Sequence, residues 1–356
     1  MNVNNPNVAY SSIVSIGEEI IKLENETGEK YLKLHRGVMD VTTINVEKAI
    51  GNLSSVLNDK LFQQYSGNDG YLPLIETIKN KFNLIEHNLI ITPGGMASLD
   101  LIINSISNKT FFIPEYHWGS WNKILKIHDK TIMTFNDLNL NSFKPFKSIV
   151  MLCYPSNPTG YMPSIDVLKK FLRYAKKNEV TVILDLPYYY LFNEFNDSLS
   201  ELFYDNVILL SSFSKSIGLS GYRIGFLATK NKNLFDSLRI RSLYKYNSIS
   251  TLPQFIINSL LEEENEINKY KSVTIKSIEK NISLLKDKNL LWTKYKKDPI
   301  GPFSIIKMSY KDLLSHNISS VPLSKFTINK TSSDEALSRI SVAVEHKIFK
   351  EYFDKI

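Results

Sequence analysis

The sequence predicts an α/β protein in which helices cover both faces of a mostly parallel sheet, together with a second, smaller α+β domain. Two observations support this fold class. Through the middle of the chain, continuous apolar runs alternate with helical patterns, which is typical of strands buried on both faces. Near the C-terminus, residues 301–308 and 337–342 instead alternate between apolar and polar side chains, like strands of a half-exposed antiparallel sheet.

The first part of the chain has mainly helical patterns. Apolar side chains at positions 13, 16, 20 and 23 have helical spacing, so residues 11–24 predict a helix. Residues 32–37 predict a strand that ends at Gly37, where the backbone can approach a ligand closely. Residues 45–61 predict a second amphipathic helix, and residues 72–82 predict a third with a proline in its first turn.

From residue 88 onward, strands and helices alternate. Strands are expected at 88–91, 109–114, 148–154, 180–184, 206–210 and 223–228, and helices at 98–106, 118–128 and 165–178. A long helical region follows residue 231, with a break around residues 247–253. We expect residues 45–280 to form the large domain and residues 281–356 the small one, with residues 1–44 packing on the small domain.

Composition limits the classes of protein to consider. The chain has 356 residues, of which 43% are hydrophobic, and this is enough for a large buried core. The net charge of +7 comes without a dense basic block interleaved with aromatic residues, so a nucleic-acid partner is not expected. The start of the chain lacks the apolar core of a signal peptide, and no apolar run approaches transmembrane length. The one cysteine, Cys153, fits a reducing compartment, so we expect a cytoplasmic protein without a membrane partner.

Four expected strand ends carry glycine or polar residues: Gly94–Gly95, Asn157, Asp185 and Lys215. Ligands of α/β sheets collect at the carboxyl ends of strands. A lysine held there against apolar walls favours its neutral, nucleophilic amine. Hydroxyl groups and Arg223 follow in the same segment and suit a phosphate. A lysine that can form an imine beside an anion site indicates pyridoxal 5′-phosphate as the cofactor.

These residues would divide the work of holding the cofactor. Asp185 can pair with a protonated ring nitrogen, while Asn157 and Tyr188 can hydrogen-bond the phenolic oxygen of the ring. Tyr116 can stack on the ring face. The phosphate donors would be the amides of Gly95 and Met96 and the side chains of Ser212, Ser214 and Arg223. Each residue alone also has an ordinary structural explanation, but their coincidence at strand ends favours a site. The histidines have no ligand spacing, so no metal site is expected.

The motifs resemble, in order, those of the fold-type I, class I and II aminotransferases, which depend on pyridoxal phosphate. The matching segments extend from about Gly37 to Arg339 and comprise Tyr65-x-Gly-x-x-Gly70, Ser156-Asn157-Pro158-Thr159-Gly160, Asp185-Leu186-Pro187-Tyr188, Ser212-Phe213-Ser214-Lys215 with Arg223, and Ser338-Arg339-Ile340-Ser341. The resemblance implies a three-layer large domain with a seven-stranded sheet. The small domain would be built from the N-terminal segment and the C-terminal part.

The same resemblance implies an enzyme that moves an amino group between an amino acid and a 2-oxo acid. Lys215 would hold the cofactor as a Schiff base and act as general base and acid. The substrate would contact Gly37, Asn157 and Arg339, whose guanidinium would bind the α-carboxylate. Tyr65 would reach the phosphate of a neighbouring subunit, which implies a homodimer with shared active sites.

Some features depart from the family pattern. Met96 offers only its amide where the family often has a hydroxyl or amide side chain, and no second arginine suits a dicarboxylate. The aromatic cluster from Tyr116 to Trp118, with Trp121, would suit an aromatic or bulky substrate, although loop packing is the simpler interpretation of His117 and Trp118. The Lys215 segment is most similar to histidinol-phosphate aminotransferases, but their N-terminal Asn-Glu-Asn-Pro pattern is missing.

Two other functions share most of these residues. A decarboxylase, a β-lyase or a biosynthetic synthase on the same fold would need nearly the same cofactor contacts, because the cofactor performs the electronic work. A ligand sensor with this fold is less favoured, because Lys215 is retained and no DNA-binding extension is evident. Amino transfer therefore remains the leading hypothesis.

Overall fold

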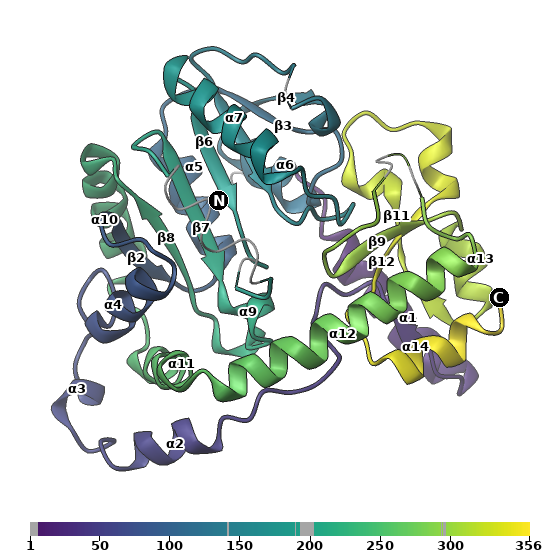
Figure 1. Ribbon diagram of the computed structural model, residues 1–356, viewed down its shortest axis with the longest axis horizontal. Helices are drawn as coiled ribbons and strands as arrows, with labels where there is room; N and C mark the ends of the chain where they lie inside the picture. Colours follow the sequence, from purple (N-terminus) through teal and green to yellow (C-terminus); the bar gives the residue numbers. More distant parts are fainter. Residues whose placement is uncertain (1–5, 141, 189, 193–202, 293, 295–296) are drawn as a thin grey trace, which may run out of the picture.

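The computed structural model describes residues 6–356 except 141, 189, 193–202, 293 and 295–296 (Figure 1). Its centre is a seven-stranded sheet. The strand order is β2 (Asn88–Thr92), β8 (Gly225–Thr229), β7 (Val207–Ser212), β6 (Thr181–Asp185), β5 (Ile149–Cys153), β3 (Thr110–Pro114) and β4 (Thr131–Phe135). β8 runs antiparallel to both of its neighbours, and the other pairs are parallel. The predicted α/β class with a mostly parallel sheet is confirmed.

The strand at the edge of this sheet, β4, was not expected from the sequence. Its residues alternate between exposed and half-buried positions until the buried Phe135. A half-exposed edge strand has no continuous apolar run, which was the pattern used to recognise the central strands. The central strands β5 and β7 are buried throughout, in agreement with the prediction.

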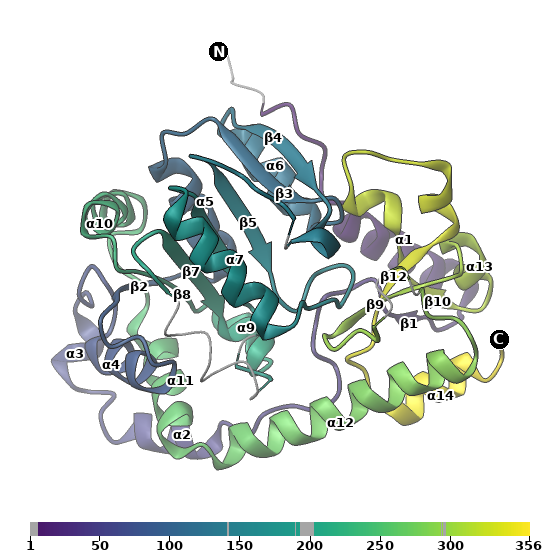
Figure 2. The same cartoon turned by 45° about the horizontal axis from the view of Figure 1, so that its top comes forward.

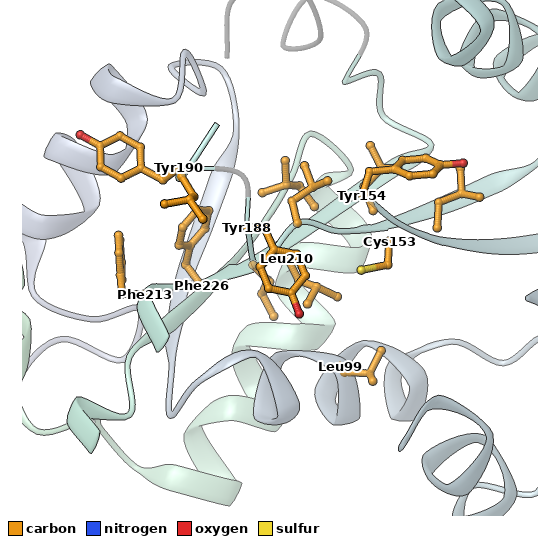
Figure 3. Packing of buried hydrophobic residues seen from close by; sticks show 14 of the residues in the cluster. Leu99, Cys153, Tyr154, Tyr188, Tyr190, Leu210, Phe213 and Phe226 are labelled. Atoms are coloured by element: carbon orange, nitrogen blue, oxygen red, sulfur yellow. The ribbon is translucent and has the colours of Figure 1, made fainter. Parts of the chain in front are cut away.

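Helices cover both faces of the sheet. α5 (Gly95–Ser105) and α7 (Ile165–Lys177) lie on opposite faces, with α7 in front of the sheet and α5 behind it in Figure 2. α5 packs on β7, β8 and α10 (Lys232–Tyr246), whereas α6 (Gly119–Ile127) packs on β4. Figure 3 shows buried aromatic rings of this core, where Phe213 and Phe226 lie 6.0 Å apart between ring centroids.

Further helices lie at one end of the sheet. α11 (Thr251–Glu263) contacts α2 (Glu47–Ser54), α3 (Lys60–Gln63) and α4 (Leu72–Lys81). The single helix expected over residues 45–61 is therefore two helices. The chain breaks before α3 because Asp59, which precedes it, adopts an extended backbone conformation.

The smaller lobe contains the chain's N-terminal and C-terminal elements (Figure 1). An antiparallel sheet has the order β11 (Val321–Pro322), β12 (Ser338–Ser341) and β9 (Phe303–Ile306), and β1 (Leu32–Lys33) pairs with β10 (Ile318–Ser319) in parallel. The helices of this lobe are α1 (Ser12–Thr27), α13 (Tyr310–Ser315) and α14 (His346–Phe353).

The strands β9 and β12 are antiparallel as predicted, but the expectation that they are half-exposed is wrong. All residues of both strands are buried. Ile305 on one face packs with α1, and Ile306 on the other belongs to the cluster that includes residues of α12 (Asn265–Asp287) and α14. Of their polar side chains, Arg339 lines a cavity, while the hydroxyl groups of Ser304 and Ser338 are buried without a hydrogen-bond partner among the described residues.

α12 runs along both lobes in Figures 1 and 2. The domain boundary that we expected at residues 280/281 falls inside this helix, which ends at Asp287. We propose the division into residues 1–44, 45–280 and 281–356 as the organisation of the chain, with α12 as the connection between the lobes. In the part of the chain that the structure describes, no helix combines the length and apolarity needed to span a membrane.

Candidate active site

The polar strand ends surround one cavity of about 310 Å³. The register explains why they meet: Cys153 at the end of β5 pairs with Asp185 at the end of β6, and Asp185 pairs with Leu210 of β7. The carboxyl ends of these parallel strands therefore lie at one edge of the sheet. The cavity is lined by Ile13, Gly37, Gly95, Met96, Trp118, Cys153, Asn157, Asp185, Pro187, Tyr188, Ser212, Ser214, Lys215, Ser220, Arg223, Phe303 and Arg339.

Lys215 lies in α9 (Phe213–Ser216), a single turn that follows β7 directly. The turn begins at Ser212, whose side chain caps it by accepting a hydrogen bond from the amide of Ser214 at 3.2 Å. Burial, aided to a smaller extent by the positive charges of Arg339 and Arg223, lowers the pKa of Lys215 to about 8. The Lys215 amine is therefore largely available as a neutral nucleophile in mildly alkaline solution.

Asp185 is the acidic group of the cavity. Its side chain is 5% exposed, and its Oδ2 accepts a hydrogen bond from Trp121 Nε1 at 3.2 Å. Burial raises the pKa of Asp185 to about 7, and the Trp121 hydrogen bond opposes this shift. No described residue forms an ion pair with this carboxyl within 4.0 Å. A cationic nitrogen in the cavity would be a favourable partner for it.

An anion cradle forms where α5 begins. Gly94 precedes α5 with φ of 94°, and a Cβ at this position would lie 2.6 Å from Nη2 of Arg223. The positive φ favours glycine, and a side chain at this position would also displace the Arg223 guanidinium. The Arg223 guanidinium donates to Ser220 O at 2.9 Å and to Pro93 O at 3.2 Å, while the hydroxyls of Ser212 and Ser214 lie 2.9 Å apart. The amides of Gly95 and Met96 in the first turn of α5 add N–H donors at the positive end of the helix.

Arg339 lies on β12 and closes the cavity from the smaller lobe. The side chain is fully buried, and its guanidinium carbon lies 4.5 Å from the ring centroid of Phe303 and 5.1 Å from that of Phe326. Nη2 donates to His35 O at 2.7 Å, whereas Nε and Nη1 have no hydrogen-bond partner among the described residues. Burial lowers the pKa of Arg339 to about 10. Because the guanidinium is buried and two of its three nitrogens lack a partner among the described residues, it fits a carboxylate.

Asn157 and Tyr188 face the same cavity. Asn157 Oδ1 is buried and has no hydrogen-bond partner among the described residues. The Tyr188 ring packs edge-on against Phe303 at 5.9 Å between centroids, and burial raises the pKa of its phenol. Three residues after Asn157, Gly160 has φ of 66°, and a Cβ there would lie 2.3 Å from Phe303 O, so the turn packs tightly on the smaller lobe.

The structure does not bring Tyr116 to the cavity, where we expected it to stack on a cofactor ring. Tyr116 is buried in a second hydrophobic cluster, where its hydroxyl donates to Asp334 Oδ1 at 2.9 Å and its ring packs edge-on with Trp292. Trp118 lines the cavity instead. His117 is buried and packs in the loop, with Nδ1 3.0 Å from Pro114 O, in agreement with the simpler interpretation for this residue.

Of the two remaining predicted site residues, Gly37 lies at the cavity and Tyr65 does not. Gly37 lines the cavity, and a Cβ at this position would lie 3.2 Å from Phe303 Cζ. Tyr65 does not line the cavity but lies on the surface, where it is 81% exposed. This exposure is compatible with the prediction that Tyr65 acts in a neighbouring subunit, which stays a prediction.

Comparison with known proteins gives one consistent result. Residues 29–356 match the family described as aminotransferase class I and II. The chain belongs to this family. A curated histidinol-phosphate aminotransferase 2 from Oceanobacillus iheyensis is 32% identical over 214 residues, which are 56% of this chain and 58% of that protein. The matched segment thus spans less than two thirds of that relative.

Solved structures of other aminotransferases share the fold over the whole chain. A double mutant of aspartate aminotransferase from Thermus thermophilus superposes with a TM-score of 0.84 at 16% identity, covering 100% of this chain and 98% of that one. A Methanococcus jannaschii protein described as similar in its active site to kynurenine aminotransferases has a TM-score of 0.82 at 20% identity, with coverage of 99% and 98%. At these identities the likeness concerns the fold.

Aminotransferases of class I and II depend on pyridoxal 5′-phosphate, and the cavity of this family member fits that cofactor. Among the described residues, the buried Asp185 carboxyl has no cationic partner and Asn157 Oδ1 has no donor, while Arg223 with its serine neighbours forms an anion cradle. These are the groups that a pyridinium nitrogen, a phenolic oxygen and a phosphate need. Among the residues with described positions, no group of three or more histidine, cysteine, aspartate or glutamate side chains could hold a metal ion.

Five cavity residues were given no site role by reasoning from the sequence: Ile13, Cys153, Pro187, Ser220 and Phe303. Ile13 comes from α1, far from the other residues along the chain, while Cys153 and Phe303 are strand residues that we had assigned to the core or to a half-exposed sheet. The sequence offered one signal for Cys153, its position at the carboxyl end of a strand. Ligands of α/β sheets bind next to these strand ends. Ile13 carries no such signal.

Proposed function

We propose that the protein is a pyridoxal phosphate-dependent aminotransferase, which moves an amino group between an amino acid and a 2-oxo acid. One observation carries this proposal: a single cavity contains Lys215, whose pKa is lowered, and Arg339, whose buried Nε and Nη1 have no partner among the described residues. The first group suits imine formation and proton transfer, and the second suits recognition of the α-carboxylate of a substrate.

The side chains would have the following tasks. Asp185 would hold the protonated ring nitrogen, Asn157 and Tyr188 the phenolic oxygen, and the donors at Gly95, Met96, Ser212, Ser214 and Arg223 the phosphate. Lys215 would hold the cofactor as a Schiff base between turnovers and would move the proton at the substrate Cα once its amine is released. The cofactor, when bound, supplies the electron-withdrawing ring that makes this proton acidic.

The lining of the cavity supports a substrate with a bulky or aromatic side chain. Ile13, Trp118 and Phe303 supply apolar surface, and the described cations of the lining are Lys215, Arg223 and Arg339. Because all three cations are assigned to the cofactor or to the α-carboxylate, none remains for the second carboxylate of an aspartate-type substrate. Histidinol phosphate is a further candidate, since the Oceanobacillus relative is named for it.

The family match favours amino transfer over decarboxylation, β-elimination or a synthase reaction. We also propose that the working unit is a homodimer in which Tyr65 completes the phosphate site of the partner. The strongly exposed ring of Tyr65 supports this proposal. A cytoplasmic location is proposed from the single, buried and unpaired Cys153.

A half-reaction assay tests the function. The purified protein with bound cofactor is mixed with each member of an amino-acid panel, and separately with histidinol phosphate, without an acceptor. Amino transfer predicts conversion to the pyridoxamine form with stoichiometric release of the oxo product. Release of carbon dioxide or ammonia instead would identify one of the alternative reactions.

A pair of lysine variants tests whether the Lys215 amine holds the cofactor. Lys215→Met is expected to abolish turnover and the absorbance of the lysine-linked cofactor near the edge of the visible range. Lys271→Met is the matched control, because burial also lowers the pKa of Lys271 to about 8 but this residue does not line the cavity. An unchanged spectrum in Lys215→Met would remove Lys215 from its proposed role.

A further inference from the structure

Trp121 contacts the acidic group of the cavity from outside. It lies in the first turn of α6, is 1% exposed and is absent from the cavity lining. Its indole Nε1 donates to Asp185 Oδ2 at 3.2 Å. The backbone amide of Trp121 also donates to Trp118 O at 2.9 Å, so the turn that places Trp118 in the cavity wall fixes the indole as well.

Asp185 receives little other support from the elements around it. From β5, the Cys153 thiol donates to Pro155 O and not to Asp185. From the segment after β6, the Tyr188 phenol has a pKa that is raised by burial and, to a smaller extent, by the charge of Asp185. Lys215 and Arg339 line the same cavity but form no ion pair with Asp185. Among the described residues, only Trp121 donates a side-chain hydrogen bond to this carboxyl.

We propose that Trp121 is a positioning residue, whose indole N–H fixes one oxygen of Asp185 and leaves the other oxygen to accept a hydrogen bond from a cationic nitrogen heterocycle in the cavity. A hydrogen bond to the charged form of a carboxyl stabilises that form. The indole hydrogen bond therefore opposes the rise in the Asp185 pKa that burial causes. It also holds the orientation of the carboxyl group, so that the second oxygen stays directed at the cavity. The inference rests on the proposed function in one respect, namely that the heterocycle is the pyridinium ring of pyridoxal phosphate.

The protonation of Asp185 is the direct readout. The full-length protein without added cofactor is titrated from pH 4 to 10 by difference infrared spectroscopy, and the carboxylic acid band of Asp185 is assigned by its absence in Asp185→Asn. The midpoint is expected near 7 in the unsubstituted protein. Trp121→Phe keeps an aromatic ring but removes the donor, so its midpoint should rise by about one pKa unit.

Trp292→Phe is the matched control, because this indole lies against Tyr116 and is not bonded to Asp185. It should leave the midpoint unchanged. A purely structural role for Trp121 would lower stability without moving the midpoint. A midpoint in folded Trp121→Phe equal to that of the unsubstituted protein would therefore overturn the proposal.

A second measurement needs no substitution at Trp121. With isotope-labelled tryptophan, the indole N–H resonance of Trp121 should titrate with the same midpoint as the Asp185 band, and Asp185→Asn should abolish this titration. An indole resonance that does not respond to the ionisation of Asp185 would contradict the inference. Neither readout requires amino transfer, so failure of the proposed function and failure of the positioning role remain distinguishable.

Discussion

Replacement of Arg339 by methionine separates substrate recognition from folding. Methionine is apolar and unbranched and keeps the part of the side-chain packing nearest the backbone, but it lacks the guanidinium, which now lies 4.5 and 5.1 Å from the ring centroids of Phe303 and Phe326. The variant loses the two unpaired donors, Nε and Nη1, that we assign to the α-carboxylate. Hydrogen bonds to charged groups contribute about 1.5–3 kcal/mol each, so two of them contribute about 3–6 kcal/mol.

Since about 1.4 kcal/mol corresponds to a factor of ten, kcat/KM for an amino-acid substrate should fall about a hundred- to ten-thousand-fold in Arg339→Met. The corresponding amine without a carboxylate lacks this interaction, and its kcat/KM should change much less. Arg241→Met is the matched control, because Arg241 is exposed on α10 and does not line the cavity. Equal losses for the amino acid and the amine would refute the assignment of Arg339.

Stability gives an independent check on the same variant. Arg339→Met loses the hydrogen bond to His35 O but also removes a fully buried guanidinium whose Nε and Nη1 have no partner among the described residues. Apolar replacement of buried charges is often neutral or stabilising. The urea midpoint of the protein without cofactor should therefore stay constant or rise. A large decrease would show that Arg339 serves the fold and not only the substrate.

Three further predictions concern the cofactor cavity. The folded state raises the pKa of Asp185 from 3.8 to about 7, so the protonated carboxyl stabilises the fold below pH 4 and this contribution is lost as the pH rises to 7. Between pH 5 and pH 8 about 3 kcal/mol of it is lost, and Asp185→Asn should remove this pH dependence, as measured by urea unfolding without cofactor at the two pH values. Gly94→Ala should displace Arg223 and weaken binding of pyridoxal phosphate about tenfold or more in an equilibrium titration, whereas Gly221→Ala, whose new methyl group would meet nothing within 4 Å, should bind normally. Tyr65→Phe should weaken cofactor binding in the dimer, whereas Tyr244→Phe should not, although Tyr244 is about as exposed as Tyr65. A monomer that is catalytically competent at assay concentrations would contradict the shared site.

The sequence by itself determined the central strands and the polar residues at their ends. An apolar run and the residue that follows it are neighbours along the chain, so both can be recognised without coordinates. Lys215 follows a continuous apolar run, and Asp185 ends another. Parallel strands place their carboxyl ends at one edge, so the meeting of these two residues could be predicted without coordinates. The edge strand β4 escaped prediction because solvent exposure removes the apolar run on which the prediction depends.

Only the tertiary structure decided which aromatic residues reach the cavity. Tyr116 and Trp118 are two residues apart in one loop, and loop backbone has no fixed periodicity from which side-chain directions follow. Trp118 lines the cavity, while Tyr116 bonds to Asp334 from a distant segment. The hydrogen bond from Trp121 to Asp185 likewise joins elements that are remote in the sequence, because it arises from the packing of α6 against the sheet edge. Contacts of this kind depend on the fold as a whole and leave no local signal in the chain.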